Sequence, residues 1–157
     1  CIRDSYKGMG LKIKKLSNSS YEIYCKTLKP IKKISTKEFP GYPTDLQAQL
    51  IATQLKSGLK SKVVENIFEN RFIHIPELRR FGANLSIKGN TVTIDKTSNL
   101  LGAEVMATDI RASFSLIIAA MMSKGKTVIN RIYHLDRGYE DFDLKLKKCG
   151  VNISRKK

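Results

Sequence analysis

The chain has 157 residues, 41% of them hydrophobic and 27% charged, as in one ordinary soluble globular domain. No apolar run approaches the roughly 20 residues that a membrane-spanning helix needs, which argues against a membrane protein. Two histidines and three cysteines (Cys1, Cys25 and Cys149) without metal-ligand spacing argue against a metal site and favour reduced thiols in a cytoplasmic protein.

The net charge of +15 raises nucleic acid as a partner. However, the lysines are scattered, with only short clusters such as residues 12–15 and 147–148. No RNA-binding motif or array of stacking aromatic residues accompanies them. We interpret most of this charge as solvated surface that attracts anionic substrates, and a module that binds RNA or another polyanion is the alternative.

Local patterns predict alternating strands and helices in the first half of the chain. Residues 10–25 have the pattern of two strands. Thr44 followed by Gln47 matches a capping box, so a helix should begin there. The β-branched and apolar run at 62–67 predicts a strand.

The pattern then continues with a short helix and a hairpin. Pro76 suits the first turn of the helix and Gly82 its end. Residues 85–94 alternate in polarity around a Gly-Asn turn, which predicts two paired strands.

The second half repeats this order. We expect a buried helix over 109–122, a strand over 127–132 and a helix that places Phe142, Leu146 and Cys149 on its inner face. A last strand should follow Gly150.

Three pairs of segments recur in the same order and at nearly the same spacing, which identifies an internal repeat. They are residues 43–50 with 107–114, 62–72 with 127–138, and 81–87 with 149–155. We therefore divide the chain into the end of one unit (1–39), a complete unit (40–101) and most of a further unit (102–157).

The repeat also predicts where charged residues gather. Asp45 and Asp109 each open a predicted helix, and Arg71 and Arg137 each follow a predicted strand. Equivalent positions of repeated units lie at equivalent places around a common axis, so we expect these side chains at one end of the domain.

Five stretches resemble the enolpyruvyl transferases: "FPGYPTDLQAQ" (39–49), "FENRFIHIPELRRFGA" (68–83), "GNTV" (89–92), "LGAEVMATDIRAS" (101–113) and "RIYHLDRGYE" (131–140). The resemblance implies an α/β fold of the inside-out barrel type, with two domains of three βαβαββ units each. This chain would form most of the second domain. The implied reaction transfers the enolpyruvyl group of phosphoenolpyruvate to the 3′-hydroxyl of UDP-N-acetylglucosamine and releases phosphate, as the first committed step of peptidoglycan synthesis. No metal or organic cofactor is implied.

The resemblance assigns Asp45 to the sugar hydroxyl, whose proton it is proposed to take. A placed carboxylate contributes roughly 10²–10⁴-fold to such a step. The alternative is that Asp45 only favours the dipole of its helix, and both roles can coexist.

Arg71, Arg111 and Arg137 match arginines around the phosphoenolpyruvate site of the family. That substrate carries roughly three negative charges, and guanidinium forks bind both its phosphate and its carboxylate. The alternative for each single arginine is a surface ion pair of little energetic value.

The remaining matched residues carry weaker expectations. Asp109 matches an aspartate near the reacting carbons, and the alternative is a salt bridge that orients Arg111. Ile67 matches a position whose backbone contacts the nucleotide sugar, with its side chain expected in the core. We interpret His74 and His134 as structural. Supporting roles near the site are expected for Glu69, Asn70 and Glu140.

Cys1 in place of an initial Met indicates a fragment. The resemblance places a mobile loop with a cysteine proton donor, and further lysine and arginine contacts, in an N-terminal half of the enzyme. The partners of this chain would be its two substrates and that half, and the chain alone is expected to be inactive.

Overall fold

The computed structural model describes residues 2–156, so Cys1 lies outside the described residues. Helices and strands alternate along most of the chain. They are α1 (Ile2–Gly8), β1 (Lys12–Lys15), β2 (Tyr21–Tyr24), β3 (Lys33–Ser35), the 3-10 helix η1 (Thr44–Leu46), α2 (Gln47–Gln54), β4 (Ser61–Val64), α3 (His74–Arg80), β5 (Leu85–Lys88), β6 (Thr91–Ile94), β7 (Glu104–Met106), α4 (Ile110–Met122), β8 (Val128–Asn130), α5 (Tyr133–Asp136) and α6 (Phe142–Lys148).

The strands form three separate sheets within residues 2–156. The largest has the order β3-β4-β6-β5, in which β3 runs parallel to β4 and the other neighbours are antiparallel. Strands β1 and β2 form an antiparallel hairpin, and β7 runs parallel to β8. The expected α/β class is confirmed, although the described strands do not close into a barrel.

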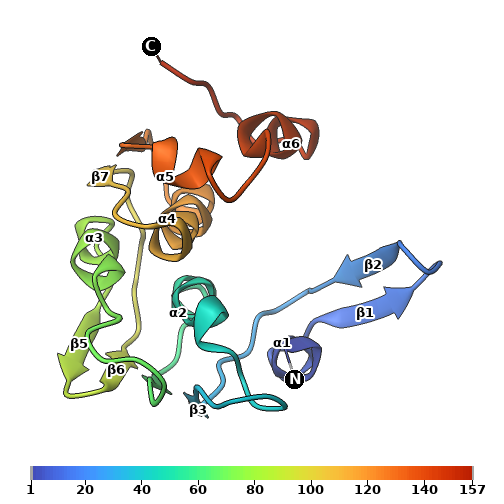
Figure 1. Cartoon of the computed structure of the whole chain (residues 1–157), viewed down its shortest axis with the longest axis vertical. Coiled ribbons are helices and arrows are strands. Elements are labelled where there is room, and N and C mark those ends of the chain that lie inside the picture. Colours follow the sequence, from blue (N-terminus) through green and yellow to red (C-terminus); the bar gives the residue numbers. More distant parts are fainter. Residues whose placement is uncertain (1, 157) are drawn as a thin grey trace.

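Helices α2 and α4 pack against each other in the middle of the molecule, while the sheets lie around them and the β1–β2 hairpin extends away (Figure 1). Helix α2 is buried on nearly all sides, including Ala48 and Ala52. Small side chains such as these let two helix backbones approach closely. Apolar residues of the largest sheet (Val63, Val92, Ile94), of α3 (Ile75, Leu78) and Phe81 directly after α3 complete the core. Buried helices with sheets at the periphery match the inside-out arrangement expected from the sequence.

Several predicted elements are confirmed almost to the residue. Helix α4 covers the predicted 109–122 because Asp109 caps an unbroken run of apolar and small residues. Pro76 lies in the first turn of α3. Gly82 (φ +84°) and Gly89 (φ +56°) adopt left-handed conformations after α3 and in the β5–β6 turn, where a Cβ would be strained.

Other expectations about the ends of elements were wrong. The predicted capping box is absent, since Pro43 and Leu46, which precede η1 and α2, make no side-chain cap and Thr44 bonds elsewhere. Strand β4 ends at Val64, three residues early, because the chain turns around the side chain of Glu65.

The last part of the chain also differs from its predicted form. The strand predicted over 127–132 covers only Val128–Asn130, because the short helix α5 follows at once. Residues 151–156 form no strand. Cys149, expected on the inner face of α6, follows the last residue of that helix and is exposed. Within residues 2–156, we find no helix long and apolar enough to cross a bilayer.

Candidate active site

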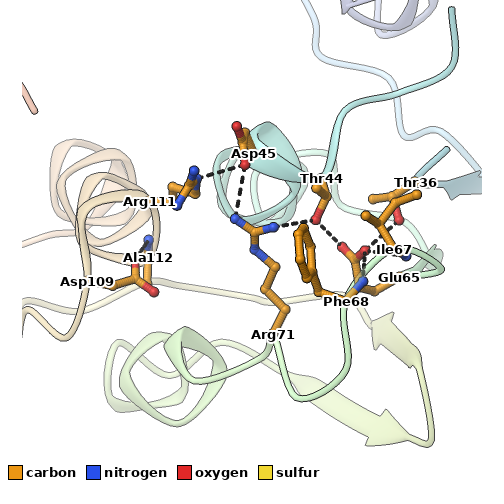
Figure 2. A network of polar contacts seen from close by, with 10 residues as sticks. All are labelled: Thr36, Thr44, Asp45, Glu65, Ile67, Phe68, Arg71, Asp109, Arg111 and Ala112. Carbon is orange, nitrogen blue, oxygen red and sulfur yellow. Dashed lines mark hydrogen bonds and ion pairs between the residues drawn. The ribbon is translucent and has the colours of Figure 1, made fainter. Parts of the chain in front are cut away.

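Asp45 lies between two arginines from different parts of the chain (Figure 2). Its Oδ1 atom is 3.0 Å from Nη2 of Arg71 and 2.8 Å from Nε of Arg111. The structure thus joins three of the predicted site residues around one carboxylate oxygen.

Two of these side chains come from the starts of helices and the third from a loop. Asp45 lies in η1 before α2, Arg111 is in the first turn of α4, and Arg71 lies in the loop between β4 and α3. Asp45 and Arg111 are 58% and 50% exposed, so a ligand can reach them, whereas Arg71 is only 20% exposed. One carboxylate between two guanidinium groups leaves an excess positive charge, which attracts an anion.

Arg71 is held on three sides. Its Nη1 donates a hydrogen bond of 2.9 Å to the hydroxyl of Thr44, and its Nη2 donates to Asp45. The guanidinium carbon lies 4.7 Å from the centre of the Phe68 ring, in cation–π geometry. Of the three predicted arginines, Arg71 therefore has the contacts that fix its side chain most firmly.

A buried carboxylate, Glu65, supports this arrangement and was not predicted from the sequence. Its Oε2 accepts from the Thr44 hydroxyl at 2.8 Å. Its Oε1 accepts from the Thr36 hydroxyl at 2.8 Å and from the backbone amides of Ile67 and Phe68 at 2.9 and 3.2 Å. The one signal for Glu65 in the sequence was its position as an acidic residue at the end of a β-branched strand.

This network changes the expectation for Ile67. Its side chain is 37% exposed and does not lie in the core as expected. Its backbone N–H is already bound to Glu65, so a contact with a nucleotide sugar would come from the carbonyl oxygen or the side chain.

Asp109 caps α4, since its Oδ1 accepts from the amide of Ala112 at 2.6 Å. The ion-pair partner of Arg111 within residues 2–156 is Asp45, so the alternative in which Asp109 orients Arg111 by a salt bridge was wrong. The opening stretch of α4 thus combines a helix cap with an arginine that faces the site.

His74, the first residue of α3, is 2% exposed, and its Nε2 has no hydrogen-bond partner within residues 2–156. Burial lowers the pKa of its imidazole to about 4; the nearby carboxylate of Asp109 opposes this shift and Arg71 adds to it. His74 therefore stays neutral close to two of the predicted site residues. The ring of His134 instead packs at a tilt of 36° against that of Tyr133, with their centroids 4.2 Å apart.

Arg137 is exposed at the end of α5. Among the described residues, no contact joins it to Asp45, Arg71 and Arg111, which we call the Asp45 cluster. Its neighbour Gly138 packs so closely on Ile110 that a Cβ there would lie 2.6 Å from the Ile110 Cγ2 atom. The backbone of Arg137 is therefore near the start of α4. Its side-chain role remains a prediction.

Glu69 and Asn70 line a separate cavity of about 540 Å³ between the loop after β4 and the β5–β6 turn. Glu140 lies 3.5 Å from Lys145 as a surface ion pair. Neither arrangement places these residues on the Asp45 cluster. No group of three or more His, Cys, Asp or Glu side chains within residues 2–156 could hold a metal ion.

Comparison with known proteins gives the family. The model of the EPSP synthase (3-phosphoshikimate 1-carboxyvinyltransferase) family matches residues 1–146. Two curated relatives are UDP-N-acetylglucosamine 1-carboxyvinyltransferases. The one from Rhodopseudomonas palustris (strain TIE-1) is 57% identical over 78% of this chain and 28% of the relative. The one from Helicobacter hepaticus is 49% identical over 99% of this chain and 37% of the relative.

Solved structures agree with this comparison. The enolpyruvyl transferase NikO from Streptomyces tendae matches with a TM-score of 0.84 and 25% identity, over 98% of this chain and 35% of that chain. EPSP synthase from Acinetobacter baumannii shares the fold, with a TM-score of 0.70 and 14% identity. The chain spans about a third of the length of the relatives it matches. The resemblance seen in the sequence is confirmed, and this chain belongs to the EPSP synthase family of enolpyruvyl transferases.

Proposed function

We propose that this chain supplies part of the active site that transfers the enolpyruvyl group of phosphoenolpyruvate to the 3′-hydroxyl of UDP-N-acetylglucosamine. The curated relatives that match it carry the name of this activity. The reaction would serve peptidoglycan synthesis in the cytoplasm, and thereby cell-wall formation, cell shape and division.

The observation that carries the proposal is the bridge of Asp45 between Arg71 and Arg111. An exposed carboxylate beside two guanidinium groups combines an anion-binding site with a group that can take a proton from a hydroxyl. Phosphoenolpyruvate, with roughly three negative charges, is the anion that such a site suits. Asp109, Ile67 and Arg137 are proposed to complete the substrate contacts.

The remainder of the active site would come from the N-terminal half of the enzyme, so we propose that the 157-residue chain alone has no transferase activity. The test uses a chimeric enzyme in which this chain replaces the matching segment of the Helicobacter hepaticus relative, with which it aligns over 156 residues. We expect the chimeric enzyme to release phosphate from phosphoenolpyruvate when UDP-N-acetylglucosamine is present. The isolated chain should release none. Product formation by the isolated chain would refute the proposal that this chain alone has no transferase activity.

Arg137 gives a sharper test of the same proposal. Arg137→Ala should abolish turnover of the chimeric enzyme while its circular dichroism spectrum and melting temperature stay unchanged. Full turnover by this variant would remove Arg137 from the site.

The net charge of +15 supports one other candidate, a basic module that binds polyanions such as RNA. That candidate predicts RNA affinity that falls steeply with salt and does not change in Asp45→Ala or Arg137→Ala. Binding assays at several salt concentrations distinguish the two.

A further inference from the structure

Glu65 is 2% exposed, yet it carries a carboxylate. Four donors satisfy that group: the hydroxyls of Thr36 and Thr44 and the backbone amides of Ile67 and Phe68. Because every one of these groups donates, the side chain acts as a carboxylate acceptor. A buried acidic group is tolerated in a protein when its oxygens are paired in this way.

The direction of the hydrogen bond between Thr44 and Glu65 is fixed by Arg71. A guanidinium group can only donate, so the Thr44 hydroxyl accepts from Arg71 at 2.9 Å. The single proton of this hydroxyl is therefore directed to Oε2 of Glu65, at 2.8 Å.

Thr36 works in the same way on the other oxygen. Its hydroxyl accepts the backbone N–H of Asn66 at 2.9 Å and donates to Oε1 of Glu65 at 2.8 Å. The two threonines thus have equivalent bonds to Glu65, but of the two hydroxyls only that of Thr44 touches an arginine of the site (Figure 2).

We propose that Glu65 is a positioning residue that fixes the guanidinium of Arg71 through the hydroxyl of Thr44. It also orders the aromatic ring on which Arg71 rests, because it binds the amide of Phe68. With Nη1 held by Thr44, Nη2 faces Asp45 in a defined direction. The effect on substrate rests on the proposed function, whereas the effect on Arg71 does not.

Four variants of the 157-residue chain separate this role from general support of the fold. Glu65→Gln keeps the shape but replaces the acceptor opposite Thr44 with an amide N–H₂ donor. Thr44→Val removes the hydroxyl, and Thr44→Ser restores it. Thr36→Val is the matched control, since it removes the equivalent bond to Glu65 without touching Arg71.

The first readout is the ¹⁵N NMR signal of the Arg71 Nη–H₂ groups, which make the bonds to Thr44 and Asp45, and their exchange with solvent. The second is the dissociation constant of phosphoenolpyruvate. Thr44→Val and Glu65→Gln should each speed the exchange and weaken phosphoenolpyruvate binding about tenfold, the effect of one charge-assisted hydrogen bond. Thr44→Ser should restore wild-type values. A fifth chain that combines Thr44→Val with Glu65→Gln should lose no more affinity than either single variant.

Wild-type exchange and affinity in Thr44→Val would overturn the proposal, and so would equal effects of Thr36→Val and Thr44→Val. A wild-type chain whose Arg71 and Arg111 signals ignore phosphoenolpyruvate would instead count against the proposed function. The exchange rates alone would then still decide whether Glu65 positions Arg71.

Discussion

The carboxylate of Asp45 and the guanidinium of Arg111 meet at 2.8 Å, although the two residues lie far apart in the sequence. The contact connects η1, which leads into α2, with the first turn of α4. Because α2 and α4 also pack against each other in the core, the two charged groups are held by the best-buried part of the fold. Asp45 and Arg111 are thus held by two helices that pack against each other, whereas Arg71 comes from the loop between β4 and α3.

Asp45 should have opposite effects on binding and on turnover. Asp45→Asn removes the negative charge that occupies both guanidinium groups, so we expect phosphoenolpyruvate to bind the chain a few-fold more tightly. Turnover of the chimeric enzyme should fall by roughly 10²–10⁴-fold, since the amide cannot take a proton. Calorimetric titration and a phosphate-release assay measure the two effects.

The control for Asp45 is Asp95→Asn, which removes the same charge from a surface pair with Lys60. Asp95→Asn should change neither the affinity for phosphoenolpyruvate nor the turnover of the chimeric enzyme. If Asp45→Asn retains full turnover, Asp45 has no part in proton removal.

Asp109→Ala should cost about 1 kcal/mol of unfolding free energy, because it leaves the amide of Ala112 without its capping partner. Asp109→Ser, which can still cap the helix, should retain most of this stability. Urea unfolding followed by circular dichroism at 222 nm measures the difference. Equal stability of the Ala and Ser variants would mean that the cap contributes nothing.

His74 should make the stability depend on pH between about 6.5 and 4. Burial lowers the pKa of the folded imidazole to about 4, so in this range the unfolded chain binds more protons than the folded one. Stability is complete above about pH 6.5 and falls as the pH decreases towards 4, by a total on the order of 3 kcal/mol.

The measurement is urea unfolding of the wild type and of His74→Gln at several pH values. The variant cannot titrate at this position, so its stability should change less over the same range. Parallel pH profiles of the two proteins would contradict the assignment.

Gly138→Ala should destabilise the chain by about 1–3 kcal/mol, because the added methyl group would overlap the side chain of Ile110. Gly8→Ala is the matched control, since a Cβ at Gly8 meets no atom within 4 Å. Thermal unfolding compares them. If both variants melt like the wild type, the segment that carries Arg137 does not pack against the start of α4.

Elements defined by local patterns could be predicted from the sequence. Helix α4 has its own cap and an apolar run, and the β5–β6 hairpin has a Gly-Asn turn. The internal repeat and the family motifs also pointed to Asp45 and Arg71, and the motifs to Arg111, and the structure brings these three residues into contact.

Features that depend on tertiary neighbours could not be predicted. Thr44 has a capping-box sequence, but a buried carboxylate from a distant strand offers its hydroxyl a stronger, charge-assisted bond. Residues 151–156 have strand-like residues, but strand formation depends on a paired neighbour, and none pairs with them in the described chain.

The central claim is that Arg71 and Arg111 form a specific anion site rather than a part of the general basic surface. The most direct measurement is calorimetric titration of phosphoenolpyruvate into the wild-type chain, Arg71→Ala/Arg111→Ala and Lys147→Ala/Lys148→Ala, which remove equal charge. We predict that the arginine variant loses at least tenfold in affinity and that the lysine variant binds like the wild type. Equal losses in the two variants, or none in the arginine variant, would contradict the account.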